Sequence, residues 1–132
     1  MADRQRVQSG APWEAQVGYC RAVRVGAHVH VAGTTGKGDT AEAQTRAIFS
    51  TIEGALAELG LSLADVVRTR MYVVDIDSDW EAIGRVHGEK LGSVRPAATM
   101  VQVSRLIEPW MRVEIEVDAV ASPAAAAVDR SG

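Results

Sequence analysis

The chain has 132 residues, of which 47% are hydrophobic, 23% charged and 5% aromatic, and its formal net charge is −3. This length predicts one domain with room for a hydrophobic core but not for a second domain. The negative charge argues against sequence-independent binding to nucleic acid, which requires a basic surface.

Cysteine content and hydropathy restrict where the protein works. The single cysteine, Cys20, cannot form an internal disulfide, which favours a reducing compartment. The N-terminus carries no basic-then-apolar leader, and no apolar run reaches the ~18 residues that a membrane span needs. We therefore expect a cytoplasmic protein with no nucleic-acid partner and no membrane partner.

The N-terminal third predicts strands and loops. Residues 4–8 could form one short strand, and residues 10–18, which hold a proline and several small residues, predict a loop. Residues 19–25 and 28–33 both alternate between apolar and polar side chains around a Gly-Ala turn. This pattern predicts a β-hairpin.

Two helices are expected. The glycine-rich segment 33–39 predicts a turn, after which Asp39 or Thr40 can cap a helix that runs to Leu59. Its apolar positions recur at three and four residues and form one core stripe: Ile48, Ile52, Ala55 and Leu59. Ser78 and Glu81 then have the spacing of a capping box, which predicts a second helix as far as Leu91.

The remaining segments predict strands and a tail. Residues 66–75 are rich in β-forming side chains, and residues 95–121 hold two strand patterns around a connector at 106–111. The order (β)ββαβαββ predicts an α+β fold, a mixed sheet with two helices on one face. Residues 1–121 would form the single domain, and residues 122–132, which lack periodicity, a flexible tail.

The uncovered sheet face predicts self-association. It would carry Arg68, Arg70 and Tyr72 from one strand and Glu114 and Glu116 from the last. A face that mixes charged and apolar side chains is typical of one completed by other subunits. We therefore expect a homo-oligomer with polar groups lining clefts between its subunits.

The last strand offers a candidate acid. Glu114, Glu116 and Asp118 alternate with apolar residues and share one face. One interpretation is a sheet face in water. The other is that Glu114 serves as an acid or base in a cleft.

Two readings are also open for Arg70. It could form a cross-strand ion pair, or its guanidinium could hold a ligand carboxylate in a bidentate fork. Either role predicts an acid close to Arg70, because an unpaired half-buried charge is costly.

Other motifs indicate no cofactor. GTTGKG at residues 33–38 lacks the spacing of a phosphate-binding loop, and DIDSD at 75–79 lacks the glycine and distal glutamate of a calcium loop. His28 and His30 share a strand face without an apparent third ligand. We expect no metal and no organic cofactor.

Three segments nonetheless resemble a known family. They read VGYCRAVRVGAHVHVAGTTG, then AEAQTRAIFSTIEGALAELGLSLADVVRTRMYVVDI, then RPAATMVQVSRL followed by VEIEVDAVA. Together they are similar to motifs of the Rid proteins, reactive intermediate deaminases that are also called YjgF-like or L-PSP proteins. The resemblance covers residues 10–121.

The resemblance implies a chorismate-mutase-like fold and a homotrimer with three clefts between subunits. It also implies hydrolysis of 2-imino or 2-enamino acids to 2-keto acids and ammonia, without a cofactor. The water-orienting glutamate of that family falls on Glu114 and its cleft tyrosine on Tyr19.

The sequence departs from the family at the carboxylate-binding positions. The family's clamping arginine falls on Ala98, beside Thr99, and its cleft serine falls on Ala32, beside Gly33. This matches the arginine-lacking subgroups. We expect a different guanidinium to hold the ligand: Arg70 first, with Arg21 or Arg95 as alternatives.

Three functions follow from this comparison. The first is hydrolysis of a small imine, enamine or related carbonyl metabolite, with Glu114 positioning water. The second is a noncatalytic trimer that binds a small metabolite or a protein in the same cleft. The third, RNA cleavage, is disfavoured by the acidic balance.

Overall fold

The computed structural model describes residues 3–122. Most of the predicted tail therefore lies outside the described residues. The elements, in chain order, are β1 (Arg4–Val7), α1 (Pro12–Val17), β2 (Ala22–Val25), β3 (His28–Thr34), α2 (Ala41–Glu58), a 3₁₀ turn (Leu63–Asp65), β4 (Val66–Val73), α3 (Ile76–Leu91), β5 (Ala97–Gln102) and β6 (Val113–Val120).

The strands form one mixed six-stranded sheet in the order β1-β2-β3-β6-β4-β5. The hairpin of β2 and β3 confirms the prediction from alternation. β6, the last strand in the chain, lies between β3 and β4 and pairs antiparallel with both. β4 and β5 are parallel and are joined through α3. The predicted α+β class and mixed sheet are both confirmed.

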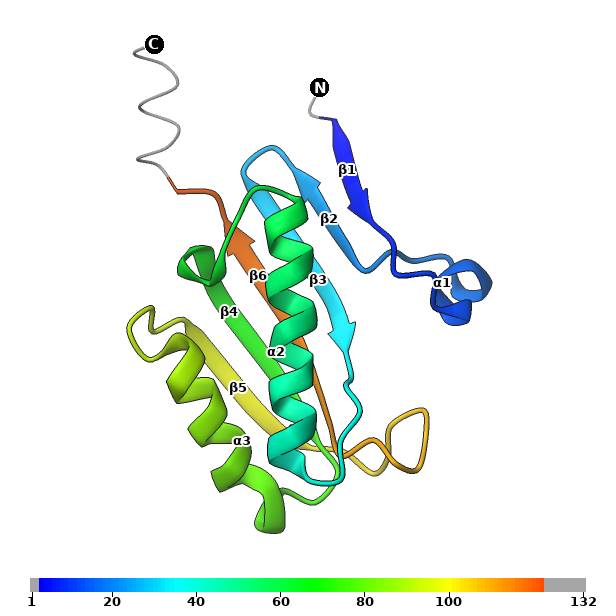
Figure 1. Cartoon of the computed structure of the whole chain (residues 1–132), viewed down its shortest axis with the longest axis vertical. Helices are drawn as coiled ribbons and strands as arrows, with labels where there is room; N and C mark the ends of the chain where they lie inside the picture. Colours follow the sequence, from blue (N-terminus) through cyan, green and yellow to red (C-terminus); the bar gives the residue numbers. More distant parts are fainter. Residues whose placement is uncertain (1–2, 123–132) are drawn as a thin grey trace.

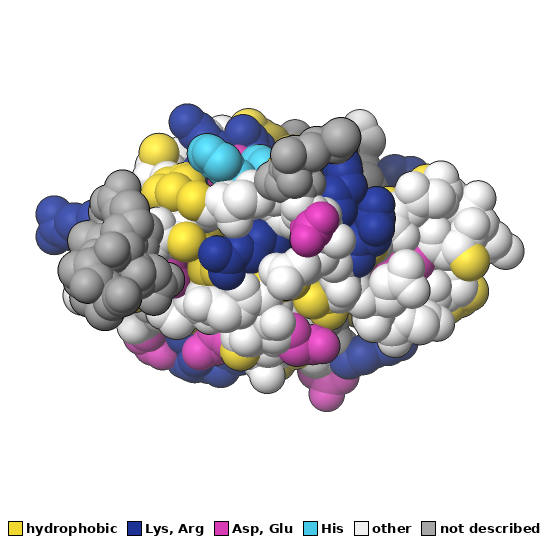
Figure 2. All heavy atoms as spheres, turned by 90° about the horizontal axis from the view of Figure 1, so that it is seen from above, with side chains coloured by type: hydrophobic (Ala, Val, Ile, Leu, Met, Phe, Trp, Pro, Cys, Tyr) yellow, Lys and Arg dark blue, Asp and Glu magenta, His cyan; other side chains and the backbone are white. Residues whose placement is uncertain are grey.

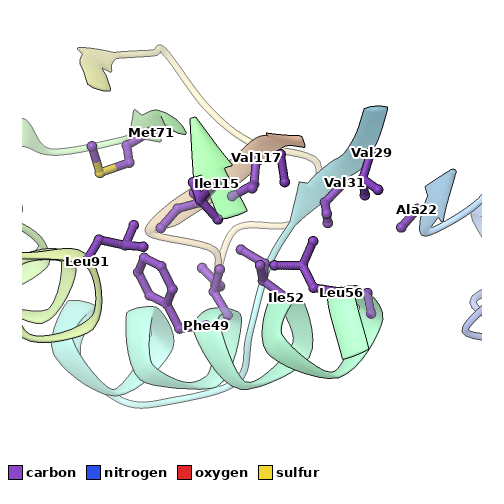
Figure 3. Close-up of a cluster of buried hydrophobic side chains, with 14 of the residues drawn as sticks. Ala22, Val29, Val31, Phe49, Ile52, Leu56, Met71, Leu91, Ile115 and Val117 are labelled. Atoms are coloured by element: carbon purple, nitrogen blue, oxygen red, sulfur yellow. The ribbon is translucent and has the colours of Figure 1, made fainter. Parts of the chain in front are cut away.

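α2 and α3 cover one face of this sheet (Figure 1). Side chains of α2 point at the sheet, where Phe49, Ile52 and Leu56 meet Ile115 and Val117 of β6 (Figure 3). All five are buried. The predicted stripe, Ile48, Ile52, Ala55 and Leu59, is buried as expected, with each member at most 5% exposed, and Leu59 follows the last residue of α2.

The opposite face of the sheet carries charged and polar side chains. Cross-strand register places Arg70 opposite Glu116, and Tyr72 opposite Glu114. The Tyr72 hydroxyl donates a hydrogen bond of 2.6 Å to Glu116. These side chains are partly buried in the single chain, so this face is neither a dry core nor a fully solvated surface.

Two local predictions were wrong. Residues 10–18 do not form a plain loop, because Pro12–Val17 is the helix α1. Proline fits the first helical position, and Gly18, at φ 90°, supplies the left-handed residue that ends the helix.

The start of α3 also differs from the prediction. The helix begins at Ile76, and the carboxylate of Asp75 caps it by accepting a hydrogen bond from the Ser78 amide. The Ser78–Glu81 pair therefore lies within the first turns and is not the cap.

None of the helices among residues 3–122 combines the length and the apolar character that crossing a membrane would require. On the face drawn in Figure 2, basic, acidic and hydrophobic side chains are interspersed.

Candidate functional site

Glu114 points from β6 toward the end of β3. Its carboxylate lies so close to Gly33 that a Cβ atom at position 33 would collide with Oε2. Only glycine, which has no Cβ atom, leaves room at position 33 for the carboxylate in its observed position. Gly33 was selected from the sequence as a site residue beside Ala32, and the structure brings it directly against Glu114.

The environment of Glu114 changes its acidity. Partial burial raises the pKa of this carboxyl above its usual value of 4.5, because the charged form loses solvation. The Arg21 guanidinium lowers the pKa and the carboxylate of Glu116 raises it, both by smaller amounts. A carboxyl with a raised pKa can release and recover a proton closer to neutral pH than an ordinary glutamate.

A cavity of about 510 Å³, here called the Glu114 cavity, opens beside this carboxylate. Its polar wall contains Tyr19, Arg21, Gly33 and Glu114. Its apolar wall comes mainly from α1 and from the connector before β6, with Trp13, Val17, Ile107 and Met111. A cavity of this size, mostly apolar and with a few converging polar groups, is typical of a small-molecule site.

Arg21 is the cation of the Glu114 cavity. One of its terminal nitrogens, Nη2, donates a hydrogen bond of 2.6 Å to the Gly33 carbonyl. Its guanidinium carbon lies 5.8 Å from the centre of the Tyr19 ring. Among the described residues, its Nε is a buried donor without a hydrogen-bond partner. Buried donors in folded proteins are nearly always paired, so this nitrogen is an exception among the described side chains.

Arg70 lies elsewhere on the open sheet face. Its Nη1 is 3.1 Å from an oxygen of Asp118 and 3.7 Å from an oxygen of Glu116. The expectation that an acid lies close to Arg70 is confirmed. The residues that line the Glu114 cavity include Arg21 and not Arg70, so the single chain does not bring Arg70 to Glu114.

The other predicted site residues are spread along the sheet. Ala32 lies in a separate shallow depression with Tyr19, Glu116 and Asp118. Ala98 and Thr99 are exposed on the edge strand β5, opposite Thr69 and Arg70 of β4. In the single chain these two positions are not part of the Glu114 cavity.

The histidines on β3 are not arranged as metal ligands. His30 Nδ1 lies 2.7 Å from Asp118 Oδ1 on the open sheet face. Among residues 3–122 no group of three or more His, Cys, Asp or Glu side chains could hold a metal ion.

Arg21 lines the Glu114 cavity, although the sequence favoured Arg70, and Trp13 lines it without having been selected from the sequence. Alternation along residues 19–25 places Tyr19 and Arg21 on the same face, which was a usable signal for the arginine. Trp13 could not be assigned because the helix that carries it was not predicted. Trp110 lies in an irregular connector, where no periodicity indicates which way a side chain points.

Comparison with known proteins identifies relatives of this chain. The family model described as Endoribonuclease L-PSP matches residues 9–121. An uncharacterised protein of Streptomyces coelicolor is 43% identical over 87% of this chain and 90% of its own length. A 3-aminoacrylate deaminase, RutC, of Acinetobacter baylyi is 40% identical over 59% of this chain and 60% of its own.

Solved structures show the same fold. A member of the YjgF/YER057c/UK114 family from Mycobacterium tuberculosis is 52% identical, with a TM-score of 0.88 over 90% of this chain and all of that one. A YjgF family member from Neisseria meningitidis is 28% identical, with a TM-score of 0.78 over 92% of this chain and 97% of that one.

Proposed function

Because the chain belongs to the endoribonuclease L-PSP family, whose members are also called YjgF-like or Rid proteins, we propose that it hydrolyses the imine or enamine of a small carboxylate metabolite in the Glu114 cavity. The observation that carries the proposal is a half-buried carboxyl of raised pKa that shares a cavity with a guanidinium. The resemblance to a 3-aminoacrylate deaminase supports the same reaction class.

Arg21 is the anion-binding group in this proposal. A ligand carboxylate in the Glu114 cavity would pair with the guanidinium of Arg21, which lines that cavity. The hydrogen bond from Nη2 to the Gly33 carbonyl fixes the orientation of this guanidinium. Tyr19 supports the cation through its ring face.

Glu114 handles the proton. Its carboxylate takes a proton from water as the water oxygen bonds to the imine carbon, and passes this proton to the imine nitrogen, which gives a neutral carbinolamine. The carboxylate then takes the hydroxyl proton of the carbinolamine and delivers it to the nitrogen as the carbon–nitrogen bond breaks, so that ammonia leaves and a carbonyl remains. Holding the substrate carboxylate at Arg21 makes this water attack a positioned step.

The site would be completed by self-association into a homotrimer, as the family resemblance implies. Arg70, Ala32, Ala98 and Thr99 lie outside the cavity of the single chain, and subunit contacts are the route by which they could take part. In this assembly the open sheet face is the contact surface.

The test is hydrolysis of 2-imino acids generated in place from amino acids by an oxidase. Wild-type protein is expected to accelerate ammonia release over buffer, and Glu114→Gln is expected to abolish the acceleration. Arg21→Gln should raise KM about ten- to a hundredfold, the loss of one charged hydrogen bond. The matched variant Arg70→Gln should have the smaller effect.

Each other outcome changes the assignment. A larger KM effect in Arg70→Gln than in Arg21→Gln would return the clamp to Arg70. Unaltered release in Glu114→Gln would remove the proposed acid. Restored or increased release in Ala98→Arg would indicate that the family's usual clamp position is still functional.

A second candidate is a noncatalytic trimer that binds a metabolite or a protein partner in the same cleft. The presence of Ala98 where the family carries its clamp favours it. Binding of 2-keto acids without acceleration of any imine would support this candidate. RNA cleavage, which the family description names, remains disfavoured by the net charge of −3.

A further inference from the structure

A second cavity adjoins the Glu114 cavity. It has a volume of about 540 Å³ and is here called the tryptophan chamber. The two cavities share four lining residues, which are Trp13, Thr35, Thr51 and Met111. The two cavities therefore lie side by side along these shared side chains.

Two indole rings and two opposite charges define the tryptophan chamber. Trp13 comes from α1, and Trp110 comes from the connector before β6, together with Glu108. The Lys37 ammonium lies 4.2 Å from the centre of the Trp110 ring, which is a cation–π contact. The contact holds the indole against the glycine-rich loop that carries Lys37.

The walls of the chamber are tied together before any ligand arrives. The buried side chain of Gln44 donates hydrogen bonds to the Gly38 carbonyl at 3.1 Å and to the Trp110 carbonyl at 2.9 Å. Its oxygen accepts a hydrogen bond of 2.9 Å from the Arg112 amide. One side chain thus joins the loop after β3 to the connector before β6. Little ordering cost is left for a ligand that binds between them.

The size of the combined site does not match a three-carbon imino acid. Either cavity alone falls in the range of about 300–1,000 Å³ that accommodates drug-sized ligands. An aliphatic tail would be buried by the apolar walls, but it would gain no aromatic stacking on the indoles. A planar ring can stack on them and gain aromatic contact beyond the burial of its area.

We propose that the tryptophan chamber binds an aromatic ring, and that the substrates of this protein are aryl-substituted 2-imino acids. This inference rests on the proposed function for the reacting end of the molecule. The carboxylate and imine lie at Arg21 and Glu114, and the ring lies between Trp13 and Trp110. Lys37 and Glu108 offer a donor and an acceptor to a polar ring substituent.

Titration calorimetry with phenylpyruvate and pyruvate tests the ring site without turnover, because both are 2-keto acids of the product class. Phenylpyruvate should bind wild-type protein at least about tenfold more tightly than pyruvate. Trp110→Ala and Trp13→Ala should each reduce that preference several-fold. The matched variant Trp80→Phe, whose indole is 52% exposed on α3, should keep the preference.

The outcomes separate this inference from the proposed function. Equal binding of the two keto acids, or a preference untouched by both Trp13→Ala and Trp110→Ala, would overturn the ring site even if imines are hydrolysed. A tryptophan-dependent preference together with no imine hydrolysis would keep the ring site and overturn only the deaminase reaction. The ring site is supported further if Glu114→Gln retains the preference, because that variant leaves the chamber unchanged.

Discussion

The folded state is less stable when the carboxyl of Glu114 is charged than when it is neutral. Burial raises its pKa above 4.5, and Arg21 offsets only part of the effect. Between pH 4.5 and the higher pKa of the folded state, the folded protein holds a proton that the unfolded chain has lost. Stability from this group therefore falls as the pH rises through that window.

Glu114→Gln should remove this titration. At pH 7 the variant should be at least as stable as the wild type. The difference in the free energy of unfolding between the two proteins should shrink toward pH 4, where position 114 is mostly neutral in both. Urea denaturation of the two proteins from pH 4 to pH 8 measures it. A variant that is less stable than the wild type at pH 7 would contradict a desolvated carboxylate.

Asp118 on the same strand provides a control of opposite sign. Burial raises the pKa of Asp118, but hydrogen bonds from His30 and Arg70 more than offset this, so its pKa lies below the usual 3.8. The charged form therefore stabilises the fold above pH 3.8, and this contribution is lost as the pH falls through the lower pKa. Asp118→Asn should be less stable than the wild type at pH 7, unlike Glu114→Gln.

For single residues, the sequence indicated the proposed acid, Glu114, more clearly than the arginine that we propose as its cationic partner. Strand alternation was enough to place Glu114 on a face apart from the core. Choosing between Arg21 and Arg70 required the register of three strands, because Arg70 lies beside Asp118 and Arg21 beside Gly33. Pairings between strands distant in sequence are not encoded in local periodicity.

The two loops beside the site depend on helix α2 for their position. Gln44 is 2% exposed. Its side chain forms hydrogen bonds with three backbone groups of irregular segments, the carbonyls of Gly38 and Trp110 and the amide of Arg112. Gln44→Leu keeps most of the volume and removes all three hydrogen bonds. It should lower the free energy of unfolding by about 2–4 kcal/mol, because buried backbone groups are left unpaired.

Chemical denaturation of Gln44→Leu measures the effect, and Gln16→Leu on the exposed side of α1 is the matched control. The control should change stability by about 0.5 kcal/mol or less. Equal effects from the two variants would show that Gln44 does not hold the loops. In Gln44→Leu the preference for phenylpyruvate should also decline, since the walls of the tryptophan chamber lose their common tether.

Helices and strands could be predicted where their hydrophobic pattern repeats over many residues. α2 and the hairpin of β2 and β3 have enough turns or alternations to be recognised. α1 has only six residues, too few for a helical repeat to be distinguished from a loop. Its available signals were end signals, Pro12 at the start and Gly18 after the end.

The open face of the sheet is the contact surface that we propose for the assembly of the whole molecule. Two helices cover one side of β3, β6 and β4 (Figure 1). On the other side, Asp118 pairs with His30 and with Arg70 across the strands. On the edge strand β5, Val101 is 41% exposed and shares this side with Tyr72. A sheet with one uncovered, partly apolar face gains stability when another copy covers it.

We therefore expect sedimentation and light scattering to give three times the chain mass of 14.1 kDa. Val101→Asp places an unpaired charge in the contact surface and should shift the assembly toward single chains. Trp80→Gln changes a comparably exposed side chain on the outer side of α3 and should leave the mass unchanged. A wild-type protein that sediments as one chain would exclude a site shared between subunits, and the reaction would then depend on the Glu114 cavity alone.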